Sequence, residues 1–588
     1  MNQQAPRTAS EAHFTCHDGV RLFYRHWPAT KSPRRGAVVM FHRGHEHSGR
    51  MAHLVDELDL PDFDFFAWDA RGHGQSPGVR GDSPSLATSI RDVQTFVDHL
   101  QAGHGLATEE LAILAQSVGA VLVSAWAHDY APRVRCLVLA SPAFKVKLYV
   151  PFARPGLALL QRLRGPVFVS SYVKAKFLTR DPERQAGYDS DPLISRSISA
   201  RILLGLYATA ERIVADAQAI TIPVQLLISG RDWVVHHAPQ HDFFARLGSA
   251  VKEKHVLADF LHDTFGERDR GVAVAAARNF IQGRFDEQPN FPDLSQADRR
   301  GATFAEAESL SRPLPILTPR GMYWWLTRLG LRIGGALSGG IRLGQETGYD
   351  SGRSLDYIYR NTPTGRGYLG RLVDRIYLDA IGWRGVRLRK GHLEELLRIA
   401  MAALATEGRP VRLLDIAAGQ GRYIIDALAG AKHRPVSLTL RDYDATNVHI
   451  GNELLRQHGL DDIGRFEQGD AFAAESLAAI EPRANVAIVS GLYELFSDNE
   501  AVGRSLSGLA QAVEAGGYLI YTGQPWHPQL ELIARALTSH RAGQAWVMRR
   551  RSQAELDQLV ASAGFDKLEQ RIDEWGIFTV SLARRRLT

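Results

Sequence analysis

The chain contains 588 residues, of which 45% are hydrophobic and 23% charged, and its formal net charge is +6. This length exceeds a single core, because domains usually contain ~100–200 residues. The two cysteines, Cys16 and Cys136, are too few for a disulfide framework and give no sign of an oxidising compartment. We therefore expect a cytoplasmic protein of at least two ordinary globular domains.

The sequence shows no targeting, membrane-spanning or nucleic-acid-binding segment. Residues 1–14 lack the apolar core of a signal peptide, and no apolar run reaches the ~18–20 residues of a spanning helix. Much of the positive excess lies in two arginine runs, 549–551 and 584–586, without a recognised nucleic-acid motif. We expect these arginines to be solvated, no nucleic-acid partner, and peripheral contact as the only form of membrane association.

Strand-like and helix-like stretches alternate from about 12 to 145, which indicates a parallel sheet with crossover helices. The stretch 145–220 differs, because its helical segments are broken by proline and glycine and strands resume only after it. Helices inserted between two strands of such a sheet usually form a lid. The predicted strands are 36–42, 63–69, 111–116, 134–141, 224–229 and 253–258.

Residues 284–320 are polar, contain several prolines and are weakly periodic, so we expect an interdomain linker. Residues 321–345 mix aromatic residues, leucine and glycine with arginine, which fits a packing helix between domains or a helix lying on a membrane surface. A second alternation begins near 386. Its predicted elements are a helix at 391–406 and strands at 411–416, 436–442, 485–490, 517–522, 566–573 and 576–583.

The sequence LAILAQSVG at 111–119 places Ser117 in a turn after an apolar strand. A serine hydroxyl becomes an effective nucleophile when a base takes its proton beside an oxyanion hole. The turn that exposes such a serine in α/β-hydrolases needs small flanking residues, and here these are Ala115 and Gly119. The motif alone is a weak signal.

The order of residues along the chain strengthens this signal. The expected order is serine, then an acid, then histidine. Asp232 follows the strand-like VQLLIS, and His262 follows the last predicted core strand, so both fall in strand-end loops. His236, His237 and Asp263 are nearby competitors, but the Gly-x-Asp spacing favours Asp232.

About 270 residues resemble the monoacylglycerol lipase and lysophospholipase branch of the α/β-hydrolases, through the ordered motifs FHRGHEHSGR, WDARGHGQS, LAQSVG, SGRD and FLHDTFGE. The resemblance implies hydrolysis of a carboxylic ester in a monoacylglycerol or lysophospholipid. We assign the oxyanion hole to the backbone N–H groups of Gly44 and Val118. Arg43 stands where the family usually has glycine, and we hypothesise that it contacts an anionic head group. Proline aminopeptidases stay an open alternative.

The sequence VRLLDIAAGQG at 411–421 joins an apolar strand to an acidic, glycine-rich loop. It lacks the third glycine of a dinucleotide fingerprint. Its D-x-A-x-G-x-G arrangement resembles motif I of class I S-adenosylmethionine methyltransferases. The resemblance implies that the acid helps to hold the amino-acid part of S-adenosylmethionine while the glycines admit the ligand. The matching residues are Asp415, Ala417, Gly419 and Gly421.

Two further acids match cofactor positions. Asp442 ends the next strand, where a carboxylate can accept both ribose hydroxyls, although an NAD enzyme would also place an acid there. Asp470 fits the family position that meets the adenine amine, but a loop aspartate also commonly forms a turn. Residues 552–585 fit the helix and β-hairpin with which class I methyltransferases end, and a dinucleotide dehydrogenase would continue into a substrate domain instead.

Methyl transfer depends chiefly on positioning, although a hydroxyl or amine acceptor can also need a base. The motifs GLYELF and GQPWHP follow two predicted strands, and their side chains fit an acceptor site or a structural role equally well. The candidate acceptor residues are Tyr493, Glu494, Trp526 and His527. The Asn/Asp-Pro-Pro-Tyr motif of DNA and protein amino-group methylators is absent, which favours a small-molecule or lipid acceptor.

The sequence thus predicts an α/β protein of two fused enzymes: an α/β-hydrolase fold with a helical lid and a Rossmann-like class I methyltransferase fold. We expect serine ester hydrolysis, S-adenosylmethionine-dependent methylation, a role in lipid metabolism and no metal. Two alternatives make the first domain a non-catalytic lipid-binding module or the second a cofactor sensor. The oligomeric state is not determined by the sequence. The predicted parts are 1–284 (hydrolase, lid about 145–220), 285–345 (linker and connecting helix) and 346–588 (methyltransferase with an N-terminal helical cover).

Overall fold

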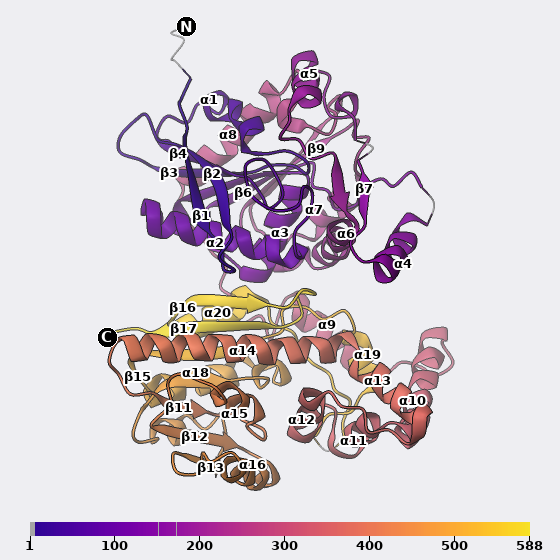
Figure 1. Cartoon of the computed structure of the whole chain (residues 1–588), viewed down its shortest axis with the longest axis vertical. Coiled ribbons are helices and arrows are strands. Elements are labelled where there is room, and N and C mark those ends of the chain that lie inside the picture. Colours follow the sequence, from indigo (N-terminus) through magenta and orange to yellow (C-terminus); the bar gives the residue numbers. More distant parts are fainter. Residues whose placement is uncertain (1–5, 151, 172, 542, 588) are drawn as a thin grey trace. The chain divides into compact units, whose positions relative to one another are not determined.

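The chain folds into two compact units, Met1–Pro292 and Asp293–Thr588, each built on its own sheet (Figure 1). The computed structural model describes residues 6–150, 152–171, 173–541 and 543–587. Among these residues, no helix combines the length and the apolar character needed to cross a bilayer.

The sheet of the first unit has the strand order β1-β2-β4-β3-β5-β6-β9-β10. The strands from β4 to β10 run parallel, whereas β1 and β2 pair antiparallel at one edge. All six predicted strands are confirmed. Five of them are central strands that are buried on both faces and read as apolar runs, whereas β10 lies at the edge and is only partly buried. The polar, exposed edge strand β1 gave no such signal. The bounds are β1 Ser10–Thr15, β2 Arg21–Trp27, β3 Gly36–Phe41, β4 Phe63–Trp68, β5 Leu111–Gln116, β6 Cys136–Ala140, β9 Val224–Ser229 and β10 Lys252–Leu257.

Helices cover both faces of this sheet. On one face, α1 (His53–Glu57) and α8 (Gly271–Asp286) close a core with alternate residues of the central strands. On the other face, Phe96 of α2 (Leu86–His104) packs against Phe41 and Trp68. The helix after the serine turn, α3 (Val118–Tyr130), packs beside α2, and α7 (Ala238–Arg246) joins the last two strands.

The predicted lid is confirmed as an insertion between β6 and β9. It also holds a two-stranded antiparallel sheet that we did not predict, because strands of three residues have no readable alternation. The lid elements are α4 Ala153–Arg164, β7 Phe168–Ser170, α5 Pro182–Ser190, β8 Ser197–Ser199 and α6 Ala200–Ala215.

The sheet of the second unit has the order β13-β12-β11-β14-β15-β17-β16. Strands β13 to β15 run parallel, and β17 inserts antiparallel between β15 and β16, as the C-terminal hairpin predicted. The short edge strand β13, with the polar sequence GRFEQ, was missed. The bounds are β11 Arg412–Asp415, β12 Ser437–Asp442, β13 Gly464–Gln468, β14 Ala484–Val489, β15 Val513–Gly523, β16 Phe565–Ile572 and β17 Thr579–Arg585.

Two helical layers enclose this second sheet. The long helix α14 (Ile381–Thr406) crosses one face together with α15 (Arg422–Leu428) and α16 (Ala445–Gln457) (Figure 1). The opposite face is closed by α17, α18 and α20. The remaining bounds are α12 Gly352–Arg360, α13 Gly367–Leu378, α17 Ala474–Ala478, α18 Asn499–Ala512, α19 Leu530–Ala536 and α20 Gln553–Ser562.

The segment predicted as a linker and connecting helix is more ordered than expected. Helix α9 (Ala302–Ser311) lies within the predicted linker and buries Leu310 against Ile533 and Met548. The connecting helix is two helices, α10 (Pro319–Leu337) and α11 (Gly339–Thr347), which meet at Ser338. The weak periodicity of α9 hid it, because its single buried leucine makes no apolar stripe.

The expectation of solvated arginines at 549–551 is wrong. All three side chains are buried, and each satisfies fixed acceptors of the second unit. Arg549 pairs with Glu555 at 2.7 Å and donates to Asn499 at 2.9 Å. Charge density along the chain cannot distinguish such a buried network from a solvated run.

Candidate active sites

Ser117 occupies a strained turn between β5 and α3. Its backbone angles are φ 55° and ψ −115°, a region that costs a residue with a side chain ~1–3 kcal/mol. A methyl group at Gly119 would lie 2.5 Å from the carbonyl oxygen of His42, so only glycine fits there. Ala115 is fully buried in β5 beside Phe41, where its methyl group is accommodated. The turn therefore holds the serine side chain at the end of the sheet.

The three residues predicted from chain order lie in hydrogen-bond contact. Ser117 Oγ is 2.8 Å from His262 Nε2, and His262 Nδ1 is 2.7 Å from Asp232 Oδ2. The other carboxylate oxygen of Asp232 accepts the N–H groups of Val234 at 2.7 Å and Val235 at 3.0 Å. The imidazole is thus fixed between the hydroxyl and the acid.

The electrostatics of these three hydrogen-bonded residues suit His262 as a general base. Burial would raise the pKa of Asp232, but attraction to His262 and the hydrogen bonds it accepts outweigh burial and lower the pKa. Asp232 therefore stays ionised and keeps the Nδ1–H of His262 directed toward it. The competitor Asp263 instead accepts from Gln116 Nε2 at 3.0 Å and pairs with Arg184, and the exposed His236 makes no contact with Ser117.

The loop after β3 brings Gly44 against Val118. A methyl group at Gly44 would lie 3.0 Å from Val118 Cγ2, so the two residues assigned to the oxyanion hole are neighbours. His42 fixes this loop, since its Nε2 accepts Ala70 N–H at 3.0 Å and its Nδ1 donates to the Arg43 carbonyl at 2.8 Å. Burial lowers the pKa of His42, which keeps this tautomer neutral.

Arg43 contacts protein groups in this structure, and its hypothesised contact with an anionic head group stays a prediction. Its guanidinium is buried, pairs with Glu46 at 2.6 Å and Asp263 at 3.9 Å, and lies over the ring of Tyr188 in the lid. Burial would lower the pKa of Arg43, but the two carboxylates outweigh it and raise the pKa. The residue joins the oxyanion loop, the histidine loop and the lid.

In the second unit, the glycine-rich loop follows β11 as predicted. Gly419 and Gly421 have positive φ angles of 58° and 72°, which favour glycine. A methyl group at Gly421 would meet Phe466 at 2.7 Å, whereas at Gly419 it would meet only Gly352, at 3.7 Å. Gly421 is thus required by packing, and Gly419 leaves open space in front of the loop.

The two motif acids serve the loop itself. Asp415 is fully buried, accepts the Tyr423 hydroxyl and the Ala417 N–H, and burial raises its pKa to about 7. Asp442 accepts the Gly419 N–H at 2.8 Å, and burial raises its pKa as well. Their contacts with a cofactor stay a prediction. Asp470 is exposed and accepts the Phe472 N–H at 2.8 Å, the geometry of a turn.

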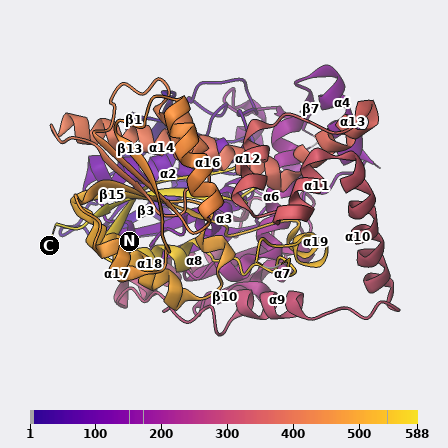
Figure 2. The same ribbon diagram turned by 90° about the horizontal axis from the view of Figure 1, so that it is seen from below.

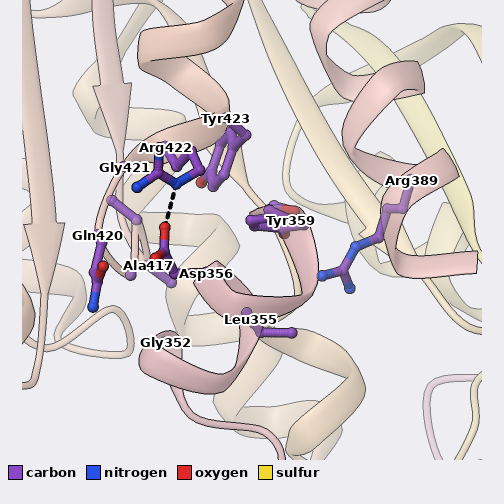
Figure 3. A pocket seen from close by; sticks show the side chains of 13 residues that line it. Gly352, Leu355, Asp356, Tyr359, Arg389, Ala417, Gln420, Gly421, Arg422 and Tyr423 are labelled. Carbon is purple, nitrogen blue, oxygen red and sulfur yellow. Dashed lines mark hydrogen bonds and ion pairs between the residues drawn. The ribbon is translucent and has the colours of Figure 1, made fainter. Parts of the chain in front are cut away.

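A pocket with about 350 Å³ of empty space, part of which is open solvent, lies between this loop and the helical cover (Figure 3). Helix α12 contributes Gly352, Leu355, Asp356 and Tyr359 to its lining, and Asp356 pairs with Arg422 across the pocket edge. The cover therefore closes over the glycine-rich loop.

Arg389 of α14 also lines this pocket, and sequence reasoning missed it. Its guanidinium is 4% exposed and points from α14 into the space beside Tyr359 (Figure 3). The nearest acid is Glu494, at 3.6 Å. Within the described chain, Arg389 Nε and Glu494 Oε2 are buried without a hydrogen-bond partner. Arg389 stands between Leu388 and Lys390, in a stretch that we predicted only as part of the helical cover, and no local signal distinguishes it from its neighbours.

The structure separates the four candidate acceptor residues. Tyr493 is buried and donates to Ser505 at 2.9 Å, a structural role, and Glu494 accepts from Thr522 at 2.7 Å beside Arg389. Trp526 lies half-buried under the guanidinium of Arg550. His527 accepts the Gln529 N–H at 3.0 Å, and burial lowers its pKa to about 4, so it is a neutral imidazole at pH 7.

Comparison with known proteins assigns each unit. A family model described as "Serine aminopeptidase, S33" matches residues 32–269, and one described as "Putative methyltransferase" matches residues 277–585. The chain is 55% identical over 581 residues to "Uncharacterized protein YnbC" of Escherichia coli, covering 99% of both chains.

Two lipases are similar in sequence to the first unit. It is 26% identical over 275 residues to the monoacylglycerol lipase of Mycolicibacterium smegmatis, covering 47% of this chain and 97% of the lipase. It is 29% identical over 235 residues to the monoglyceride lipase of Homo sapiens, covering 37% of this chain and 72% of the lipase. The predicted fold class is confirmed: an α/β-hydrolase domain with a lid is followed by a Rossmann-like methyltransferase domain.

Proposed function

The chain belongs, through residues 277–585, to the family described as "Putative methyltransferase", and with this premise we propose that it is a bifunctional enzyme. Its first site would hydrolyse a carboxylic ester of monoacylglycerol or lysophospholipid type. Its second site would transfer a methyl group from S-adenosylmethionine to a small molecule or lipid. The observation that carries the hydrolase is the hydrogen-bonded chain of Ser117, His262 and Asp232.

This chain of hydrogen bonds supports nucleophilic catalysis. His262 Nε2 takes the proton of Ser117 as Oγ attacks the ester carbonyl, and Asp232 stabilises the imidazolium that forms. The N–H groups of Gly44 and Val118 would donate to the oxyanion, which is usually the largest single contribution to such catalysis. His262 then protonates the departing alcohol, and a water molecule repeats the sequence to release the acid.

The lid favours a lipid ester over a peptide with a free amine. From residue 142 to residue 180 the chain has no acidic residue that could bind an ammonium group. Large apolar side chains of this stretch are exposed, among them Val150, Phe152 and Leu163. Because buried charges need opposite partners, an aminopeptidase would require an acid near the bound amine, and this apolar stretch supplies none; the acids of the lid all follow it, from Asp181 onward.

Labelling with a fluorophosphonate probe tests the hydrolase. We expect covalent labelling of the wild type and none of Ser117→Ala, whereas Ser124→Ala, a buried serine of α3 that bonds only its own helix, should label normally. Absence of labelling in the wild type would establish the non-catalytic lipid-binding module instead. Hydrolysis of proline naphthylamide in preference to monoacylglycerol would establish the aminopeptidase.

The pocket beside Gly419 fits S-adenosylmethionine by the chemistry of its lining. Arg389 Nε–H is buried and unpartnered within the described chain, so a carboxylate there would satisfy it, and Glu494 balances the charge of the arginine. Gly419 leaves room for a ligand to approach the backbone. When bound, S-adenosylmethionine supplies a sulfonium methyl group. The residues of the loop and cover would orient it and exclude water.

Calorimetry with S-adenosylhomocysteine tests cofactor binding, and lipid mass spectrometry with labelled methyl donor tests turnover. We expect binding by the wild type and a labelled lipid or small molecule that disappears in Asp415→Ala. Comparison with Ser117→Ala shows whether hydrolysis supplies the methyl acceptor. Binding without any labelled product would indicate a sensor, and absence of binding would exclude the proposed cofactor.

A further inference from the structure

Helix α10 exposes an apolar stripe although it belongs to a folded unit. Met322, Leu326, Leu329 and Ile333 recur at spacings of four, three and four residues, which places them on one face of the helix. The side chains of Leu326 and Ile333 are 53% and 61% exposed. Two interfacial aromatic residues, Tyr323 and Trp325, are exposed beside this stripe.

Helix α13 carries a second exposed stripe next to the first. Tyr368, Leu369, Leu372 and Ile376 are all exposed. Helix α10 packs against both α11 and α13 along the edge of the second unit (Figure 2). We name the exposed side chains of these two helices the α10–α13 face.

The α10–α13 face is also strongly basic. From residue 312 to residue 345 the chain has five arginines and no acidic residue, although Arg312 and Arg320 pair with Glu308 and Glu531. Arg332, Arg366 and Arg371 are exposed, and among the described residues none of them forms an ion pair. The only acid on the α13 turn between Leu372 and Ile376 is Asp374, which is buried and bonded to Ser338. The face therefore presents apolar and positive groups together.

We propose that the α10–α13 face binds the surface of a membrane rich in anionic phospholipid. An interfacial helix combines a stripe of Leu, Trp and Tyr with flanking arginines, because the apolar side chains enter the acyl boundary while the guanidinium groups meet phosphate. Tyr and Trp are enriched at this depth. A second copy of the chain fits less well, because two identical positive faces repel each other.

This surface is continuous with the cover of the methyl-donor pocket. Helix α11 packs against both α10 and α12, and α12 lines the pocket with Asp356 and Tyr359. Membrane binding would therefore place the same helical cover next to lipids. The inference does not depend on the proposed function, because it rests on exposure and charge alone.

Sedimentation of the full-length protein with vesicles tests the proposal. We expect the wild type to bind vesicles of equal phosphatidylglycerol and phosphatidylcholine at least about tenfold more strongly than pure phosphatidylcholine, with binding weakened by salt. Leu326→Glu combined with Ile333→Glu should weaken binding at least about tenfold, and Arg332→Gln and Arg371→Gln about fivefold each. Leu568→Glu, at a 50% exposed leucine of β16, should bind like the wild type.

Three outcomes would overturn the proposal. The first is a wild type that binds neither kind of vesicle. The second is binding that survives the α10 changes but is lost in Leu159→Glu with Leu163→Glu, two exposed residues of lid helix α4. The third is a dimer in light scattering that Leu326→Glu with Ile333→Glu converts to monomer without loss of vesicle binding. Unchanged circular dichroism of each variant shows that folding is retained.

Discussion

The two candidate sites differ in how completely their buried polar groups are satisfied. In the serine site, Ser117, His262 and Asp232 form a closed chain, and Asp232 also accepts two backbone N–H groups. In the pocket beside the glycine-rich loop, Arg389 Nε and Glu494 Oε2 are buried with no partner among the described residues. A buried polar group without a partner costs ~1–3 kcal/mol. Within the part of the chain that the structure describes, buried atoms without a hydrogen-bond partner also occur in the loop beside the serine site, at Arg43 Nε and His45 Nδ1, so the contrast holds for the three residues of the catalytic chain itself. Under the proposed function, a ligand would complete the second site.

The largest effect is expected from a substitution that breaks the hydrogen-bonded chain of Ser117, His262 and Asp232. Asp232→Asn should lower kcat for ester hydrolysis by about 10⁴-fold, because an amide no longer fixes the tautomer of His262. Asp263, which follows His262 in the sequence, is the matched control. Asp263→Asn should keep kcat within about tenfold of the wild type, and it should lower Tm because the charge that contacts Gln116 and Arg184 is lost. Steady-state kinetics with a nitrophenyl ester measures both, and equal losses of kcat would contradict the assignment of Asp232.

The second prediction contrasts two buried arginines of the second unit. Arg549→Met removes the partner of buried Glu555 and Asn499 and should lower the free energy of unfolding by ~3–5 kcal/mol. Arg389→Met breaks no short hydrogen bond to Glu494, which lies 3.6 Å away, but leaves this buried carboxylate without its charge partner, so we expect a smaller loss of ~1–3 kcal/mol without ligand. Urea unfolding of the two variants measures the difference. Equal destabilisation would mean that Arg389 is a structural residue.

The third prediction sharpens the role of Arg389 as a ligand group. Arg389→Met should weaken S-adenosylhomocysteine binding by about 10–100-fold, the value of a charge-assisted hydrogen bond to a carboxylate. Binding of 5′-methylthioadenosine, which lacks the amino-acid part, should not change. Arg398→Met, an exposed residue of the same helix, is the matched control. A parallel loss for both ligands would place Arg389 elsewhere in the pocket.

The smallest expected effect concerns Asp415, whose pKa burial raises to about 7. A raised carboxyl pKa adds stability below the unfolded pKa, and this contribution is lost as pH rises through the folded pKa. Relative to Asp415→Asn, the wild type should lose about 1.6 kcal/mol of unfolding free energy between pH 5.5 and pH 7. Parallel unfolding titrations measure it, and a difference that does not vary with pH would show that Asp415 is ionised throughout.

The serine site was largely predictable because each residue stands at a strand end. Apolar strands locate the sheet, and the ends of parallel strands meet at one edge, so Ser117, Asp232 and His262 could be paired from chain order. Their catalytic roles stay a prediction. Arg43 could not be interpreted in this way, because besides the local Glu46 it contacts Asp263, which is 220 residues away in the sequence, and Tyr188 of the lid.

The methyl-donor pocket was only half predictable, because one of its walls is a local loop and the other is formed by residues distant in the sequence. The loop from Asp415 to Gly421 has a local signature, since its glycines are needed for positive φ and close approach. Arg389 has no local signature, because helical periodicity does not say which distant loop its face will meet. Tyr493 was misplaced among acceptor candidates, since its hydroxyl turns to Ser505 of α18.

The sequence by itself determined the two α/β units, the positions of most strands along the chain, the inserted lid, the serine turn and the glycine-rich loop, because each depends on residues that are close along the chain. Only the tertiary structure decided which charges meet: Arg43 with Asp263, Arg549 with Glu555, and Arg389 with the open pocket. Charge pairing depends on three-dimensional distance and on burial, and neither quantity is encoded in local pattern.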